Sequence, residues 1–448
     1  MELAELVAQL DAYDGAQRQG ALQQLVGLEQ SGDLAPAQPG EGFNLHAHTF
    51  FSYSGAGYSP THLAWRAHRQ GWWALGTVDF DVLDGVGETF SAADLLGLRA
   101  AAGIETRVYV PELAEAESNS PGEPGIMYLV GVGLASSSPA AGAVDTLADM
   151  RSRAQSRNRE MIARINAYLA PVSIDLERDA APLTPAGNVT ERHILVAYDA
   201  AARRRYHRRS DLVAFWADRL GMPLEHVDAM LGETPYPHDA IRNRLMKRGG
   251  VGYSQPDAGT FPSLCDVVQA TVACGAVPTY AFLDGSSGAE SRLEELLELM
   301  VDHGIGGMTI IPDRNWNISD PATKAARLAD LSRAMQLAEA LSLPVLAGTE
   351  MNKPGQREMD DFDAVELRPY WPAFKRGAAW LWGHTAMARR FGCGHQSSWA
   401  RGWMPSRSAR LGFFAALGSS LAANDPRWEQ VEQALVQGPE GILAALTH

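Results

Sequence analysis

The sequence predicts an α/β fold, a barrel of alternating strands and helices interrupted by a helical insertion. Short apolar runs alternate with helical patterns from residue 43 to about 133, and the alternation resumes after residue 262. Between these regions the chain is charged and amphipathic, with no strand pattern. The 448 residues are 46% hydrophobic, which is ample for a large core.

Residues 1–40 are expected to form a helical N-terminal extension and a linker. Leucines recur at helical spacing in 3–10 and again in 22–28, and the Pro/Gly-rich stretch SGDLAPAQPGEG follows them. The barrel begins after this linker.

Residues 41–139 are expected to form the first part of the barrel. The run FNLHAH predicts a strand, and a helix follows in which Ser59 is the cap, Pro60 fits the first turn and Gly71 closes the end. The runs WWALGTVDF, IETRVYV and IMYLVGVG then predict further strands. This β-α-β rhythm implies a largely parallel sheet.

Residues 140–262 are expected to form a helical insertion that covers the barrel. Residues 263–395 then supply its second part, with strands predicted at GAVPTYAF, GGMTIIP and PVLAGTEMN. Residues 396–448 are expected to form a helical tail.

Composition and charge exclude several classes of partner. The net charge of −15, from 53 acidic and 38 basic residues, opposes binding to nucleic acid. Three cysteines at spacings unlike a zinc knuckle or a disulfide framework suit the cytoplasm. No signal core and no long apolar run is visible, so we expect a cytoplasmic protein with no membrane partner. The sequence does not indicate an oligomeric state.

His46 and His48 are the first candidate metal ligands. Side chains two residues apart on a strand point to the same face, so both imidazoles can bind one cation. The carboxyl end of a barrel strand is a usual place for such ligands. The alternative is a pair of hydrogen-bonded histidines at a strand end. Asp79, Asp81 and Glu105 follow at successive strand positions, which favours a metal site.

The ordered motifs resemble those of the polymerase and histidinol phosphatase (PHP) family. They are HAHTFFSYSG, VDFDVLDGV, GIE, FPSLCDVVQATVACGAVPTYA and GTEMN, from about residue 43 to 352. Family members have a distorted seven-stranded (β/α) barrel and hydrolyse phosphoesters with up to three divalent metals. The resemblance therefore implies a distorted (β/α)7 barrel with a helical insertion, helical N- and C-terminal extensions and a metal-dependent hydrolase site.

Several ligands of the family are replaced in this chain. Residues that cannot supply the expected ligand stand at five matching positions: Ser54, Phe80, Tyr128, Phe282 and Asn352. The set that binds one metal in the family survives as His46, His48, Glu105 and Glu350. The resemblance thus implies a single divalent transition metal, either Zn, Mn or Fe, with Asp79 and Asp81 as partners of the ligand imidazoles.

Other residues are candidates for substrate binding and proton transfer. Arg192 and His193, in VTERHILVAY, resemble a family element that points towards the substrate phosphate, although Arg192 could equally lie on a solvated helix face. His384, between a strand-like aromatic run and a helix, is a candidate acid or base, with a helix cap or a buried core histidine as the alternative. Two loops at strand ends add possible anion-binding groups, or else solvated turns, at Arg314, Asn352 and Lys353.

The function expected from these features is a PHP-like metal-dependent hydrolase, a phosphoesterase that acts on a small phosphorylated molecule. Two alternatives stay open: a metal-dependent lyase, isomerase or hydrolase of a carbohydrate-like substrate, and a catalytically inactive binding module. The sequence contains no Walker loop, Gly-x-Ser-x-Gly elbow or Rossmann fingerprint, so nucleotide-dependent transfer and serine hydrolysis lack support.

Overall fold

A seven-stranded sheet lies at the centre of the protein. The computed structural model describes residues 2–232 and 238–446, and within them the strands follow the order β1 to β7. All neighbours are parallel except β4, which runs antiparallel to both β3 and β5. The strands are β1 (Phe43–Ala47), β2 (Ala74–Phe80), β3 (Arg99–Tyr109), β4 (Ile126–Val132), β5 (Val277–Phe282), β6 (Gly307–Ile310) and β7 (Val345–Ala347).

The sheet curls until its two edges meet. The segment after β7 returns to β1 through a parallel bridge between Ala47 and Glu350. The Glu350 N–H donates to the carbonyl of His46 and the His48 N–H donates to the carbonyl of Glu350, both at 2.7 Å. The result is a nearly closed, distorted α/β barrel with a helical insertion and helical extensions, which confirms the fold class that the sequence predicts.

Helices cover the outside of the barrel, and its strands are therefore buried on both faces, as all five residues of β1 illustrate. In α3 the Ser59 side chain accepts from the His62 N–H and Pro60 occupies the first turn, as predicted from the sequence. The barrel helices are α3 (Pro60–Arg69), α4 (Val86–Leu96), α10 (Leu264–Ala273), α11 (Leu293–Asp302), α12 (Asp313–Trp316), α13 (Pro321–Ala340) and α14 (Trp371–Phe391).

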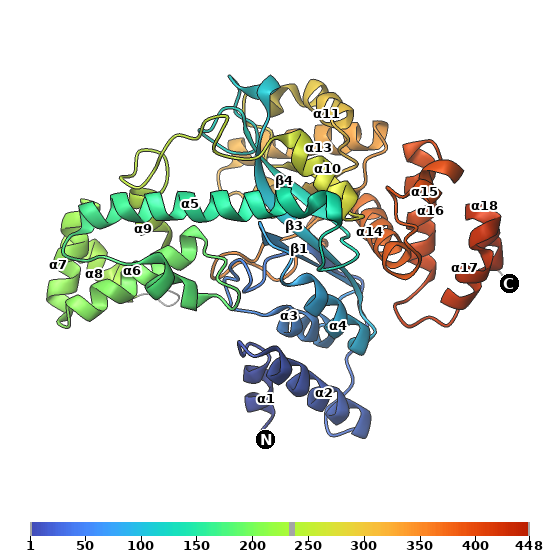
Figure 1. Ribbon diagram of the computed structural model, residues 1–448, viewed down its shortest axis with the longest axis horizontal. Coiled ribbons are helices and arrows are strands. Elements are labelled where there is room, and N and C mark those ends of the chain that lie inside the picture. The colour runs from blue at the N-terminus through green and yellow to red at the C-terminus, as the bar shows by residue number, and fades with distance from the viewer. Residues whose placement is uncertain (1, 233–237, 447–448) are drawn as a thin grey trace.

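The segment between β4 and β5 forms a helical body with its own core. Its long first helix, α5, runs along the barrel and carries the body to one side of it (Figure 1). Tyr198 and Trp216 are fully buried inside this body. Residues 233–237, within the predicted insertion, lie outside the described part. The helices are α5 (Val144–Leu169), α6 (Glu191–Arg205), α7 (Arg209–Leu220), α8 (Leu224–Gly232) and α9 (His238–Leu245).

Helices at both ends of the chain pack on the barrel helices (Figure 1). At the N-terminus, Arg18 of α2 forms an ion pair with Glu88 of α4. At the C-terminus, α16 lies against α14 at a close approach, because a Cβ at Gly383 would overlap the Phe414 carbonyl oxygen. These helices are α1 (Leu3–Gln9), α2 (Gly15–Ser31), α15 (Ser398–Trp403), α16 (Arg407–Ser420), α17 (Trp428–Ala434) and α18 (Gly438–Ala445). None of the helices in the described residues combines the length and the apolar composition needed to cross a bilayer.

Candidate metal centre and cavity

The neighbouring strands β1, β2 and β3 bring two histidines and a glutamate together. His46 lies on β1, His48 just beyond it and Glu105 on β3. Glu105 Oε2 is 2.9 Å from His46 Nε2 and 3.2 Å from His48 Nε2. One ligand atom from each residue lies within 4.8 Å of the others, and all three side chains are buried. This is the geometry of three side chains that could hold one metal ion.

Glu105 and His48 shift each other's pKa. Burial by itself would raise the pKa of Glu105, but the two adjacent imidazoles outweigh it and lower the pKa to about 2. Burial opposes the charged form of His48, yet contacts with Glu105 and the nearby charge of Asp79 raise its pKa. Among the described residues, His46 Nδ1 is buried without a hydrogen-bond partner, and His48 Nε2 is buried with no partner apart from the 3.2 Å contact with Glu105. Buried nitrogens of this kind call for a ligand, and imidazole with carboxylate is a metal-binding set.

A hydrogen-bond chain fixes the orientation of His48. Its Nδ1 lies 3.2 Å from Ser52 Oγ, which in turn donates to Asp79 Oδ1 at 2.6 Å. Asp79 is itself held by the backbone N–H and the hydroxyl of Thr49. With Nδ1 as the donor to Ser52, Nε2 is the nitrogen of His48 that faces the group around Glu105. Asp81 lies apart from this chain and accepts from the Thr106 hydroxyl at 2.5 Å.

Glu350 lies beside β1, but its carboxylate faces other partners. Arg314 Nη2 donates to Glu350 Oε1 at 2.8 Å, and Asn352 Nδ2 donates to Glu350 Oε2 at 3.3 Å. The carboxylate is therefore outside the group formed by the two histidines and Glu105. Ligation of a metal by Glu350 stays a prediction, and it requires the carboxylate to exchange these partners for the ion.

Aromatic rings occupy the space next to His48. The Phe80 ring stacks on the imidazole with centroids 4.5 Å apart and planes 18° apart. Tyr128 lies 6.5 Å from Phe80, between ring centroids, and Phe282 is almost fully buried. Ser54 is also buried, and its hydroxyl has no partner among the described residues. The replaced ligand positions Phe80, Tyr128 and Phe282 thus line the cavity described next.

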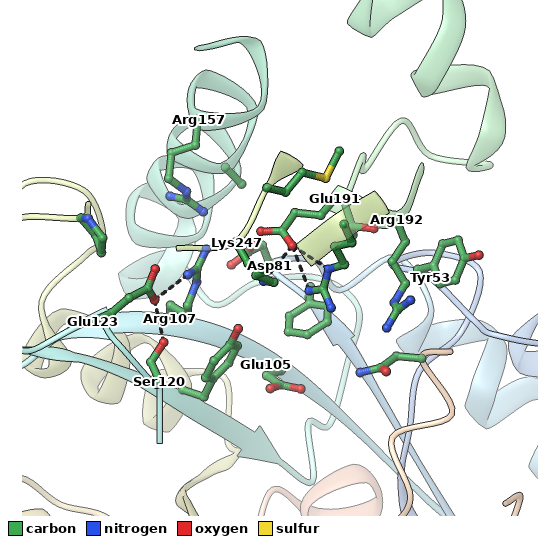
Figure 2. Close-up of a pocket in the computed structure, with 18 of the residues that line it drawn as sticks. Tyr53, Asp81, Glu105, Arg107, Ser120, Glu123, Arg157, Glu191, Arg192 and Lys247 are labelled. Carbon is green, nitrogen blue, oxygen red and sulfur yellow. Dashed lines mark hydrogen bonds and ion pairs between the residues drawn. The ribbon is translucent and has the colours of Figure 1, made fainter. Parts of the chain in front are cut away.

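A cavity of about 1270 Å³ opens from this group towards the helical insertion. Its lining contains eleven arginines and lysines against nine aspartates and glutamates, so it is net positive in a chain whose net charge is −15. Figure 2 shows basic side chains from β3, α5 and the insertion converging above Glu105. Such a lining favours an anionic ligand. The basic residues are Arg107, Arg153, Arg157, Arg164, Arg192, Arg242, Lys247, Arg248, Arg314, Lys353 and Arg357.

Most of these basic residues are absent from the sequence-based candidates. Arg107 had a usable signal, because it lies two residues after Glu105 on the same strand and so shares its face. Arg157, on the helix α5, and Lys247, just after the end of α9, had none, because polar residues of this kind do not reveal what they will pack against. Glu191 is the acid at the centre of this region, where Arg242 and Lys247 both bind its Oε2 at 2.9 and 2.8 Å.

The predicted substrate residues fall into two groups. Arg192 and Lys353 line the cavity with Arg314 and Asn352, and Arg192 is bound to Asp239 at 3.2 Å. His193 does not line it. Instead, His193 Nδ1 accepts the Thr190 backbone N–H at 3.1 Å and helps to cap α6, and burial lowers its pKa to about 4.

His384 lies in the core and does not line the cavity. Its Nδ1 accepts the His395 backbone N–H at 2.9 Å, and its Nε2 donates to the carbonyl of Gly133 at 3.1 Å. The strand-like run predicted just before it is wrong, since Trp371–Phe391 is one helix of 21 residues. The aromatic residues of that run are buried in the helical packing, which overrides their strand preference.

Burial of a neutral His384 makes folding sensitive to acid. Burial lowers its pKa to about 4, whereas in the unfolded chain the value is near 6.5. The unfolded state therefore binds the proton first, and the stabilisation is present above pH 6.5 and lost as the pH falls towards 4. We compare the free energy of unfolding of the parent with that of a His384→Gln variant. The parent-minus-variant difference should be about 3 kcal/mol larger at pH 7 than at pH 4. Urea titrations of both proteins between pH 4 and pH 7 measure this difference. A difference that does not change with pH would contradict the prediction.

Comparisons with known proteins identify the fold. No protein-family model and no curated protein matches the chain. An amidohydrolase from Chromobacterium violaceum, solved with bound sulfate and no metal, is 17% identical with a TM-score of 0.51, over 75% of this chain and 96% of its own. A candidate metal-dependent phosphoesterase from Bifidobacterium adolescentis is 19% identical with a TM-score of 0.46, over 75% and 97%. At these identities the likeness to the amidohydrolase establishes a shared fold.

Proposed function

We propose that the protein is a PHP-like metal-dependent hydrolase that cleaves the phosphoester of a small phosphorylated molecule. One observation carries the proposal: a buried group of His46, His48 and Glu105 opens into a cavity with a net positive lining. An acidic chain that gathers basic side chains around a potential metal site is suited to an anionic substrate.

The donor set fits a single divalent transition metal. Two imidazole nitrogens and a carboxylate suit Zn, Mn or Fe, and Glu350 is the proposed further ligand from the segment hydrogen-bonded to β1. Phe80 and Phe282 cannot coordinate a cation, and the Phe80 ring fills the space beside His48, which supports one metal. When bound, such an ion supplies a water of lowered pKa and neutralises charge on the phosphoryl oxygens.

The protein's own side chains would hold the substrate in place. The Ser52 and Asp79 chain keeps His48 oriented, as is common for metal-binding histidines. Arg314 offers a planar fork to a phosphoryl group, and Lys353 offers a point charge at the cavity rim. His193 and His384 do not reach the cavity, so we assign proton transfer to neither of them.

Metal content tests the proposal directly. We expect about one equivalent of a divalent transition metal per chain in protein purified without chelator, and none in a His46→Ala/His48→Ala variant, because two of the three ligands are removed. A His207→Ala/His226→Ala variant is the matched control, since both of these histidines are exposed and outside the site. Two or three equivalents would contradict a single-metal site. No metal in folded protein resupplied with these ions would contradict the enzyme proposal.

A substrate screen with the bound ion separates the proposed reaction from its rival. Phe80 and Tyr128 line the cavity next to the metal group, and aromatic rings of this kind could stack on a sugar. We therefore propose, as the second candidate, a metal-dependent lyase, isomerase or hydrolase of a carbohydrate-like substrate. Phosphate release from small phosphoesters supports the first proposal. Turnover of unphosphorylated sugars only would replace it with the second.

A further inference from the structure

Two arginines on the insertion side of the cavity stack on one aromatic ring. The guanidinium carbon of Arg107 lies 4.3 Å from the centroid of Phe261, and that of Arg157 lies 4.2 Å from it. Arg107 comes from β3 and Arg157 from α5, and both line the cavity. Figure 2 shows the Arg157 guanidinium pointing from α5 towards Arg107. The pair thus spans the contact between barrel and insertion.

Arg107 is bound to a carboxylate, whereas no described carboxylate is bound to Arg157. Arg107 Nη1 donates to Glu123 Oε2 at 3.0 Å. Arg157 Nη1 donates to the carbonyl oxygen of Thr260 at 3.1 Å, and no carboxylate in the described residues forms an ion pair with Arg157. In that same part of the chain, neither Nε nor Nη2 of these two arginines has a hydrogen-bond partner. Each guanidinium therefore keeps N–H groups free for a further acceptor.

Arg157 has no ion-pair partner among the described residues, and its surroundings disfavour its charged form. Burial, together with the like charge of Arg107, lowers the pKa of Arg157 to about 10, although a guanidinium normally holds its proton far more tightly. The charges of Asp81, Glu123 and Glu191 offset this lowering in part, although none of them forms an ion pair with Arg157. A partly buried charge with no ion-pair partner is retained at a cost in stability, and such costs are often found at functional sites. An oxyanion between the two forks would satisfy the free donors and remove the repulsion.

We propose that Arg107 and Arg157 form a second anion-binding subsite, which holds a phosphate group of the substrate remote from the bond that is cleaved. The substrate would then carry two anionic groups, one at the metal group and one at the insertion. The proposal deepens the proposed function, because both subsites belong to one cavity, but the arginine pair uses none of the proposed metal ligands. Phosphate binding there can therefore be tested without the metal site.

Calorimetric titration of inorganic phosphate into the full-length protein, at constant ionic strength, tests the subsite. We expect saturable binding that persists in the His46→Ala/His48→Ala background and weakens about tenfold when Arg157→Ala is added, because one of the two forks is lost. Arg159→Ala is the matched control: Arg159 lies on the same helix, is exposed and pairs with Glu177, so affinity should not change. Acetate, which carries a single charge, is expected to bind more weakly than phosphate.

The outcomes separate the two proposals. Phosphate affinity that is lost with the two histidines and unaffected by Arg157→Ala would overturn the subsite, as would the absence of saturable binding. Persistent binding in a protein that hydrolyses nothing would retain the subsite and reject the proposed function. Arg157→Ala is expected to melt no lower than the parent, because repulsion with Arg107 is relieved. A melting temperature several degrees lower would assign a structural role instead. Arg157→Lys keeps the charge without the fork and should bind with intermediate affinity.

Discussion

Replacement of Glu105 by glutamine is expected to remove the metal and to lower kcat/KM by at least about 1,000-fold, or about 4 kcal/mol. Glu105 is the residue that joins the site, because its Oε2 lies within 3.2 Å of a nitrogen of both histidines. Glutamine keeps the shape but replaces a charged ligand with a neutral amide. The measurements are the metal dissociation constant by chelator competition and kcat/KM on the phosphoester that the screen identifies.

Glu160→Gln is the matched control for this variant. Glu160 also lines the cavity, is exposed and lies 3.9 Å from Arg164, so the same chemical change is made away from the histidines. We expect near-normal metal affinity and activity. Equal losses in both variants would point to a general effect of cavity charge. Full metal binding and activity in Glu105→Gln would contradict the three-residue site.

The grouping of His46, His48 and Glu105 was predictable because it depends on local rules. Side chains alternate along a strand, so His46 and His48 had to share a face wherever the strand ended. Strands next to each other in sequence became neighbours in the sheet, which brought Glu105 to the same end. The Ser59 cap of α3 follows from equally local chemistry.

Features that depend on packing between distant segments were not predictable in this way. The sequence predicts that Arg157 lies on a helix, but only the fold shows that it stacks on Phe261 beside Arg107. Glu350 has the right side chain at the right strand end, yet Arg314, from α12, binds its carboxylate. In each case the deciding partner comes from another part of the chain, so sequence spacing carries no information about it.

Glu191 is the acid that joins the helices bordering the cavity. It is the first residue of α6, and its Oε2 binds both Arg242 of α9 and Lys247. Burial by itself would raise its pKa, but Lys247, Arg242 and Arg107 outweigh it and lower the pKa to about 2. Without this carboxylate, Arg242 and Lys247 would lose their shared ion-pair partner at the cavity wall. The loss of one partner from a partly buried ionic group is more costly than the loss of an exposed pair.

Glu191→Gln is accordingly expected to lower the free energy of unfolding by about 3 kcal/mol at pH 7. Because the folded pKa lies below the unfolded value near 4.5, this stabilisation is present above pH 4.5 and is lost as the pH falls towards 2. The gap between parent and variant in urea titrations should therefore narrow with acid. Glu177→Gln, which breaks an exposed pair with Arg159, should cost less than about 1 kcal/mol. Equal losses in the two variants would show that Glu191 acts as an ordinary surface charge, with no part in joining α6 to α9.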